Sequence, residues 1–275
     1  AGIASAATNN GTGIASIGFS CKIMAVKCKP DGDTGPNIPD AYDGVQYAIA
    51  AGAKVISMSW GGDQGGSFGQ SIMNAANSYD IVLVAAAGND NVNTAFYPAA
   101  YQNVISVGST GSNDAKSSFS NYGTTIDVMA PGSNIYSTLA GSNASYGNQS
   151  GTSMACPLVS GLCGLILSLN PDLYPSDVED CLKNGCDNID TQNPNYVGEI
   201  GAGRINAYQS LLCAMPTPDL DVKAGGISGF GKVNCSGNLT PSFFLQNNGT
   251  QPLSSATVSY TIDGGSAQTI NWTGS

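Results

Sequence analysis

The sequence of 275 residues contains no histidine. This chain's own residues can therefore form neither a zinc site with histidine ligands nor a serine nucleophile activated by a histidine base. No two of the eight cysteines form a C-x-x-C pair, so the spacing typical of zinc-binding loops is missing as well. We assign no metal ligand to the chain from its sequence.

Charged residues are also scarce, at 10% of the chain against roughly 25% in an average soluble domain. Nine basic and 19 acidic residues leave a formal net charge of −10. Nucleic-acid binding needs basic patches that contact phosphates, so we expect no nucleic-acid partner. The acidic balance favours a secreted protein whose copies repel one another, and we expect a monomer.

No stretch of 18 or more consecutive apolar residues occurs, and the sequence therefore predicts no membrane span. A signal-peptide pattern is missing too. The chain begins with Ala1 instead of methionine, already within a regular pattern, and we interpret it as a fragment or a processed product. Apolar residues still make up 41% of the sequence, which is enough for a hydrophobic core.

The eight cysteines bear on the redox environment in which the protein works. An even number in a chain rich in Gly, Ser and Asn favours some disulfides and an oxidising environment, although buried free thiols are an equally weighted alternative. Cys156 and Cys163 lie on one predicted helix, about 10 Å apart, which is too far for a bridge. Cys181 and Cys186 flank a predicted helix end at Gly185 and could close a small loop.

Short apolar runs alternate with segments of helical periodicity as far as residue 215. Such alternation is typical of an α/β domain with a mostly parallel, doubly wound sheet. Strands are predicted at 21–27, 54–59, 81–86, 103–107 and 126–129, with a turn at 130–132 and a hairpin at 134–149. Helices are predicted at 40–51, 70–79, 154–169, 175–185 and 206–213.

The pattern changes after residue 215. We expect a domain over 1–215, a Pro-rich linker over 216–218, and the start of a small antiparallel β-domain over 219–275. The last region alternates with period two and has too few strands to close a β-sandwich. Its predicted strands are 242–245, 257–262 and 268–272, with turns at 247–249 and 263–265.

Three segments at the carboxyl ends of predicted strands or at a helix start are candidates for a site. In open α/β sheets ligands bind at that edge. Ser153 opens a helix, whose N-terminus offers free N–H groups and a positive dipole. Asn89 offers a side-chain N–H to a developing oxyanion, as acyl transfer requires. The Gly-containing segment Ser59–Gly61 offers a bare backbone edge with which an extended peptide can pair.

Each of these residues also has a plainer interpretation. Taken singly, Ser153 is a helix cap, Asn89 a turn residue and Ser59–Gly61 a strand end. Asp127 and the loop 88–93 carry oxygen atoms of the kind that bind calcium, but a solvated loop is the simpler explanation. The occurrence of all three segments in this order is what favours a functional site.

The motifs resemble those of the subtilisin family of serine endopeptidases, the subtilases. Gly151-Thr-Ser-Met-Ala-Cys-Pro157 is similar to the family's nucleophile motif, with Cys156 where serine or alanine is commoner. Ala85-Ala-Ala-Gly-Asn89 is similar to its oxyanion-hole motif and Val55-Ile-Ser-Met-Ser-Trp-Gly-Gly62 to its substrate-binding strand. The resemblance extends over about residues 1–215, with framework segments at Phe96–Ala99, Asp127–Gly132 and Gly203–Asn206.

The resemblance implies a role for each matching residue. Ser153 would be the nucleophile, with Asn89 and the Ser153 N–H donating to the oxyanion. The small residues expected at the pocket for the P1 side chain indicate room for a large apolar P1 group. Such chemistry requires no cofactor, and structural calcium, which family members often bind, has no assignable ligands here. The residues expected to pair with substrate backbone are Ser59, Trp60 and Gly61, and those expected at the P1 pocket are Ala86, Ala87 and Gly88.

The chain departs from the family in its catalytic triad, which consists of a serine, a histidine and an aspartate. Family members carry the aspartate on their first core strand and the histidine in a His-Gly-Thr-His helix start. Ala1-Gly2-Ile3 resembles the sequence directly after that motif, so we expect both partners upstream of residue 1. Leu158 stands where the family commonly has another histidine. The chain alone should be nearly inactive, because loss of triad members lowers the rate by several powers of ten.

Two functional hypotheses follow. The first is a secreted serine endopeptidase that hydrolyses polypeptides through an acyl-enzyme at Ser153, of which this chain is a part lacking the aspartate and the histidine. The alternative is a non-catalytic binding or adhesion protein on the same scaffold. The intact motifs around Ser153 and Asn89 favour the first.

Overall fold

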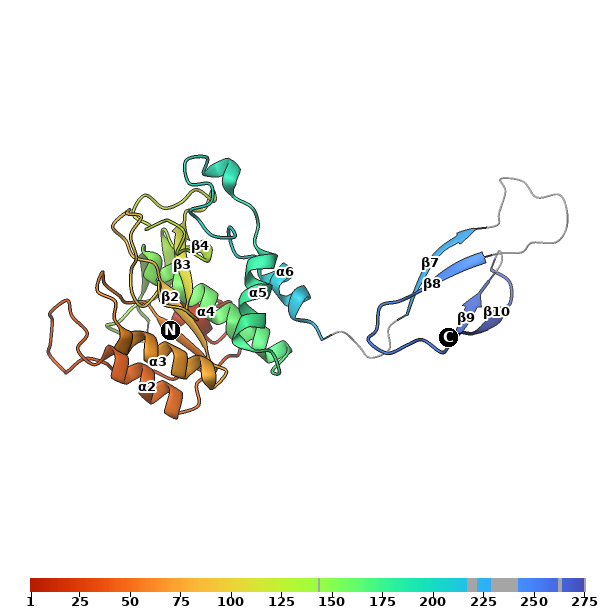
Figure 1. Cartoon of the computed structure of the whole chain (residues 1–275), viewed down its shortest axis with the longest axis horizontal. Helices are drawn as coiled ribbons and strands as arrows, with labels where there is room; N and C mark the ends of the chain where they lie inside the picture. The colour runs from red at the N-terminus through yellow and green to blue at the C-terminus, as the bar shows by residue number, and fades with distance from the viewer. Residues whose placement is uncertain (143, 217–221, 229–241, 262–263, 275) are drawn as a thin grey trace. The chain divides into compact units, whose positions relative to one another are not determined.

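A computed structural model describes the chain except for residues 143, 217–221, 229–241, 262–263 and 275 (Figure 1). The chain divides into two compact units, Ala1–Met215 and Pro216–Ser275. Most of the expected linker 216–218 lies outside the described residues.

The first unit is built on a parallel sheet with the strand order β1-β2-β3-β4. Every residue of β2 is buried, which is typical of a strand whose sheet is covered on both faces. The α/β fold class expected from the sequence is confirmed. The strands are β1 (Val55–Met58), β2 (Val82–Ala86), β3 (Ile105–Thr110) and β4 (Val128–Pro131).

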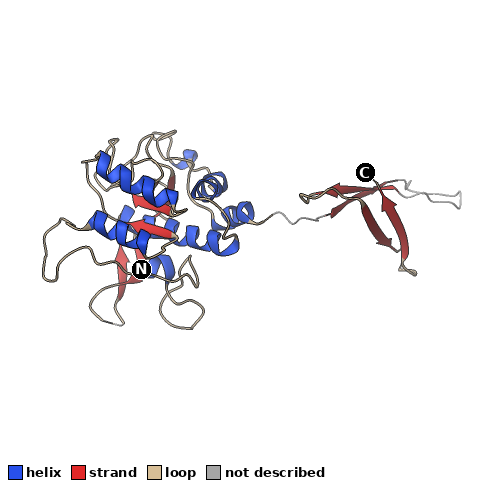
Figure 2. Cartoon of the chain, turned by 60° about the horizontal axis from the view of Figure 1, so that its bottom comes forward, coloured by secondary structure: helices blue, strands red, loops and turns tan. Residues whose placement is uncertain are grey.

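Helices cover both faces of this sheet, as Figure 2 shows. Successive side chains of β2 point to opposite faces. Val82 and Val84 pack in one core cluster with helix α4, while Leu83 packs in another with helices α2 and α3. The helices are α1 (Gly2–Ser5), α2 (Ala41–Ala50), α3 (Ser67–Ser78), α4 (Thr152–Leu169), α5 (Pro175–Gly185) and α6 (Ala207–Ala214), with a 3₁₀ turn η1 at Asp190–Gln192.

Helix α4 is the element around which this unit is packed, because it contacts all four strands of the sheet. Gly161 allows α1 to approach closely, since a methyl group there would lie 2.6 Å from the carbonyl oxygen of Ala4. Helix α4 is also long enough and apolar enough to cross a membrane. No other helix in the described residues meets both criteria. Helix α4 has a mean hydropathy of 1.7, and 56% of it is buried inside the protein.

Several predicted helix ends are confirmed by their local chemistry. Gly52 follows α2 with φ at +78°, a left-handed conformation that glycine adopts without strain. Pro175 opens α5, and the Tyr174 N–H donates to the Asp177 carboxylate at 2.9 Å. The Asn206 side chain caps α6 by accepting from the N–H of Gln209.

The strand predicted at 21–27 is wrong. The segment forms no strand, and Ile23 and Met24 are 46% and 44% exposed. Val26 alone of its apolar residues packs against a core cluster. A strand needs a neighbour in register to accept its hydrogen bonds, and no strand in the described part of the chain lies beside this segment.

The turn predicted at 130–132 is also partly wrong, because β4 continues to Pro131, which pairs with Thr110 at the end of β3. A proline fits there since β4 is the last strand in the sheet order and need not donate on its outer side. The hairpin predicted at 134–149 is confirmed by β5 (Ile135–Thr138) and β6 (Tyr146–Gln149), which pair antiparallel.

A disulfide joins Cys181 of α5 to Cys213 of α6, so the predicted Cys181–Cys186 loop is wrong. Helices α5 and α6 pack against each other, which brings these two cysteines together across 32 residues of sequence. Cys156 and Cys163 are buried free thiols, and they form no bridge with each other, as their spacing on one helix predicted.

Removing this disulfide by Cys213→Ala is expected to lower the free energy of unfolding by about 2–4 kcal/mol, because the bridge restricts the unfolded chain. Urea unfolding of the oxidised protein measures the change. Cys186→Ala is the matched control, since this nearby thiol is unbridged. An equal loss in both variants would show that the bridge contributes nothing of its own.

The second unit contains two antiparallel strand pairs. Its strands are β7 (Val222–Ser228), β8 (Ser242–Asn247), β9 (Ser255–Tyr260) and β10 (Gln268–Thr273), and β7 pairs with β8 and β9 with β10. Strand β7 was not predicted, because Gly225 and Gly226 interrupt its pattern, and the register shifts between Ala224 and Ile227. Part of the turn predicted at 263–265 lies outside the described residues.

Candidate active site

The candidate site lies where the carboxyl end of β1 meets the N-terminus of α4. The Ser153 hydroxyl donates to the backbone carbonyl of Ser59 at 3.1 Å. In return, the Ser59 hydroxyl donates to the backbone carbonyl of Ser153, also at 3.1 Å. Two segments that are 94 residues apart in sequence are thereby joined. Ser153 is half-buried and Ser59 is exposed, so a ligand can reach both.

The Asn89 side chain is held beside Ser153 by its neighbour Thr152. Asn89 Oδ1 accepts from the Thr152 N–H at 2.8 Å and from the Thr152 hydroxyl at 3.0 Å. Because its oxygen is committed, the amide must present Nδ2 to the other side. Asn89 Nδ2 and the Ser153 N–H have no hydrogen-bond partner in the described part of the chain. The site therefore holds two unpaired donors at one helix N-terminus.

Thr152 has a positioning function that the motif did not reveal. It is fully buried at the first position of α4. Its hydroxyl donates to Asn89 and accepts from the N–H of Gly88 at 3.2 Å, so it ties the loop after β2 to the helix. The burial of this polar side chain reveals the role, and the sequence does not show that burial.

Asn121 is a second residue that sequence reasoning missed. It is 2% exposed, and its Nδ2 donates to the carbonyl of Ala87 at 2.9 Å. Its Oδ1 accepts from the N–H groups of Asp90 at 2.9 Å and Val92 at 3.3 Å. Asn121 thus fixes the loop that carries Asn89, from a polar segment in which no sequence pattern marks it.

The predicted peptide-binding edge is short. The carbonyl of Ser59 already accepts the Ser153 hydroxyl, so a substrate N–H would compete for it. The backbone groups of Trp60 and Gly61 make no hydrogen bond with the described residues. Gly62 pairs with Tyr97 in both directions, at 2.8 and 2.7 Å, which ends the free edge.

The side chains around this edge are well packed. The Trp60 ring is half-buried and lies edge-on to Tyr42, with 5.4 Å between centroids. Ala86, Ala87 and Gly88 are all buried at the end of β2, facing the same edge of the sheet. The structure thus places the predicted site residues at the carboxyl ends of β1 and β2, beside the start of α4.

Cys156 is not a rival nucleophile, although it lies one turn after Ser153 on α4. It is fully buried, and its thiol donates to the carbonyl of Val84 at 3.6 Å. Burial raises the pKa of the Cys156 thiol, which keeps it protonated and unreactive.

Several of the oxygen atoms considered for calcium are engaged by other partners. Asp127 Oδ1 pairs with Lys183 Nζ at 2.7 Å, and Oδ2 accepts from the N–H of Ser106 at 2.8 Å. In the loop 88–93, the Asn91 side-chain oxygen accepts from Lys116 Nζ at 2.8 Å. These oxygens are held by protein partners, and the described residues contain no group of three His, Cys, Asp or Glu side chains that could hold a metal ion.

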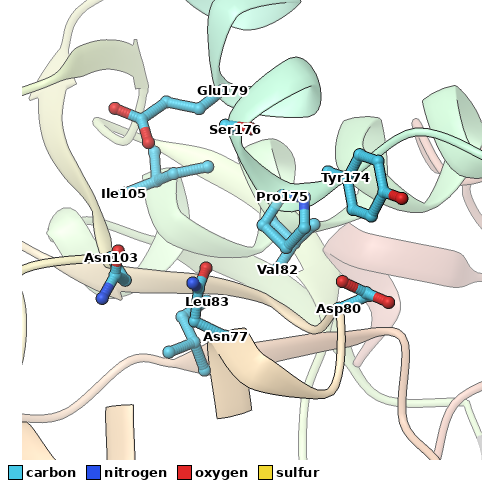
Figure 3. A pocket seen from close by; sticks show the side chains of 10 residues that line it. All are labelled: Asn77, Asp80, Val82, Leu83, Asn103, Ile105, Tyr174, Pro175, Ser176 and Glu179. Atoms are coloured by element: carbon cyan, nitrogen blue, oxygen red, sulfur yellow. The ribbon is translucent and has the colours of Figure 1, made fainter. Parts of the chain in front are cut away.

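A cavity of about 270 Å³ lies at the other end of the sheet (Figure 3). It is bordered by Asp80 after α3, by Val82 at the start of β2 and by Pro175 at the start of α5. Because the amino ends of parallel strands lie opposite the edge that carries Ser153, this cavity is separate from the candidate site.

The parallel sheet, the serine at the helix start and the asparagine beside it define a serine hydrolase of the α/β class. The model of the Subtilase family matches residues 1–203, and the chain belongs to this family of serine peptidases. It is 44% identical to thermitase of Thermoactinomyces vulgaris over 211 residues, which cover 77% of this chain and 72% of thermitase.

Two further comparisons agree. The chain is 39% identical to an extracellular protease of Xanthomonas campestris pv. campestris, over 78% of this chain and 39% of that protein. Among solved structures it is similar to a protease of Pseudoalteromonas arctica PAMC 21717, with a TM-score of 0.68 and 34% identity, over 78% of this chain and 69% of that chain. The subtilisin-like fold expected from the motifs is confirmed. The chain thus spans 72% of thermitase but only 39% of the extracellular protease. The activity of the whole protein is therefore a proposal.

Proposed function

We propose that Ser153 is the nucleophile of a secreted serine endopeptidase that hydrolyses peptide bonds in polypeptides. The observation that carries the proposal is that three groups lie together at the N-terminus of α4. They are the Ser153 hydroxyl, the unpaired Ser153 N–H and the unpaired Asn89 Nδ2, beside a free backbone edge at Trp60 and Gly61. Acyl transfer needs this combination of nucleophile, oxyanion donors and peptide-binding edge.

The reaction follows from these positions. A peptide lies along the edge 59–61, and the Ser153 oxygen attacks its carbonyl carbon while losing a proton to a base. The carbonyl oxygen becomes an oxyanion, which accepts from Asn89 Nδ2 and the Ser153 N–H. Collapse breaks the C–N bond while the base returns its proton to the leaving amine, and water then hydrolyses the acyl group left on Ser153.

This chain has no histidine to serve as the base that takes the proton of Ser153. The Ser153 hydroxyl donates to the carbonyl of Ser59, a neutral amide oxygen that accepts a hydrogen bond but is too weakly basic to take the proton. We therefore propose that the chain alone is close to inactive and that a base from outside these residues completes the enzyme.

Secretion and a monomeric state belong to the same proposal. The Cys181–Cys213 disulfide favours an oxidising compartment, and relatives include an extracellular protease and a cell wall-associated protease of Bacillus subtilis. The net charge of −10 disfavours self-association.

Labelling with a fluorophosphonate tests the nucleophile. The Ser153 oxygen displaces fluoride at phosphorus, and the probe marks the serine that reacts. We expect slow labelling of the chain alone, faster labelling when imidazole is added as a base, and none at this position in Ser153→Ala. Mass spectrometry of the digested protein locates the label. Rapid stoichiometric labelling without imidazole would contradict the proposed inactivity.

The alternative is a non-catalytic protein that binds peptides on the same scaffold. The observation in its favour is that the Ser153 hydroxyl is engaged by Ser59 instead of by a base. This alternative predicts that imidazole does not accelerate labelling of Ser153, whereas peptides still bind to the chain.

A further inference from the structure

The ring of Phe96 lies between the two segments that would flank a P1 side chain. A methyl group at Gly61 would collide with Phe96 Cε1 and lie 2.9 Å from Cδ1. A methyl group at Gly88 would lie 3.1 Å from Cδ2 and from Cγ of the same ring. Since Cδ1 and Cδ2 are on opposite edges of the ring, the ring spans the gap from Gly61 to Gly88.

The backbone that carries this ring is held by its neighbours. Tyr97, the next residue, pairs with Gly62 through two backbone hydrogen bonds of 2.8 and 2.7 Å. The carbonyl of Phe96 accepts from the N–H of Ala100 at 2.8 Å. A methyl group at Gly88 would also meet Asn121 Nδ2, so the space beside Gly88 is already filled on two sides. Phe96 itself is half-buried.

We propose that Phe96 is the floor of the P1 pocket and restricts the site to small P1 side chains, such as those of glycine, alanine and serine. The inference rests on the proposed function, because it concerns the substrate of the same serine. A side chain that enters between 59–61 and 86–88 would meet this ring, because the ring lies within 3.1 Å of a methyl group at either Gly61 or Gly88. A larger group requires the ring to move against Gly61 and Gly88, and well-packed sites resist such overpacking.

This inference replaces the sequence-based expectation of a large apolar P1 group. That expectation considered only the small size of Ala86, Ala87 and Gly88. The glycines at 61 and 88 instead leave room for the Phe96 ring, so the space they provide is occupied by the protein itself.

The test measures binding of two peptides that differ in their C-terminal residue, alanine or phenylalanine, and that resemble the acyl-side product. Ser153→Ala is used beside the unaltered chain, because binding does not require the reaction. We expect the alanine peptide to bind at least about tenfold more tightly, as expected when a pocket is too small by one or more methylene groups. Isothermal calorimetry gives both dissociation constants.

Phe96→Ala should open the pocket and shift the ratio of the two constants by at least about tenfold in favour of phenylalanine. Phe96→Leu keeps more of the packing and should shift it less, which guards against a fold defect in the alanine variant. Tyr79→Ala is the matched control, because Tyr79 is 67% exposed at the C-terminal end of α3. It should leave the ratio unchanged.

The outcomes separate this inference from the proposal on which it rests. Equal binding of the two peptides to the unaltered chain, or a ratio that Phe96→Ala does not move, would overturn the role of Phe96 and leave the peptidase proposal standing. Failure of both peptides to bind any of the proteins would overturn the peptide-binding edge, and the P1 inference with it.

Discussion

Asn89→Leu is expected to slow the imidazole-dependent labelling of Ser153 by about 10²–10³, a range known for loss of this kind of donor in subtilisin, itself a member of the family. Leucine has a similar shape but lacks Nδ2, the unpaired side-chain donor beside Ser153. The variant removes a hydrogen bond that forms only when charge develops on the oxygen, together with the two bonds that Asn89 Oδ1 accepts from Thr152. The observed rate constant for labelling, followed by intact-protein mass spectrometry, gives the ratio.

The control for this variant is Asn93→Leu, in the same loop. Asn93 is exposed, and its Nδ2 donates to Glu199 at 2.8 Å, away from Ser153. We expect its labelling rate to stay within about twofold of the unaltered chain, since surface changes away from such features cost little. Equal slowing in both variants would mean that the loop, and not the Asn89 donor, determines the rate.

Leu162→Ala is expected to lower the free energy of unfolding by about 3–5 kcal/mol. Leu162 lies in the middle of α4 with none of its surface exposed, in the core cluster between the sheet and α5 and α6. Truncation removes its apolar contacts and leaves a cavity that the packed surroundings fill only in part. Urea unfolding of the chain, monitored by tryptophan fluorescence and circular dichroism, measures the loss.

Leu169→Ala on the same helix separates burial from helix propensity. Leu169 is 42% exposed at the last position of α4, so the same chemical change there should cost less than about 1 kcal/mol. Similar losses at the two positions would show that α4 is not the packed core helix described above.

Much of the fold could be predicted because local patterns and tertiary packing agree. Strand β2 is a continuous apolar run and is buried on both faces. Helices α5 and α6 begin at a proline and at an asparagine cap, as expected from their sequences. The segment 21–27 shows the limit of such reasoning, because an apolar run becomes a strand only where a neighbouring strand accepts its hydrogen bonds.

The site could be predicted as far as its motifs extend. Ser153, Asn89 and Ser59 lie together as their positions at strand ends and a helix start indicated. Thr152 and Asn121 were missed because their partners are distant in sequence, 63 residues for Thr152 and Asn89 and 34 for Asn121 and Ala87.

Phe96 illustrates a further limit. It stands in a segment that the motifs identified only as framework, and its effect on the pocket depends on two glycines at distant positions, 61 and 88. Small residues in a sequence indicate space, but only the structure shows which side chain fills it.

The central claim is that Ser153 is a working nucleophile that lacks only its base, and the dependence of its labelling on imidazole tests this most directly. The rate of modification at Ser153 should rise in proportion to neutral imidazole. It should therefore increase with pH through the pKa of imidazole, at about 6.5–7, and then level off. A rate at Ser153 that is independent of imidazole concentration, or a label that survives Ser153→Ala, would contradict the account.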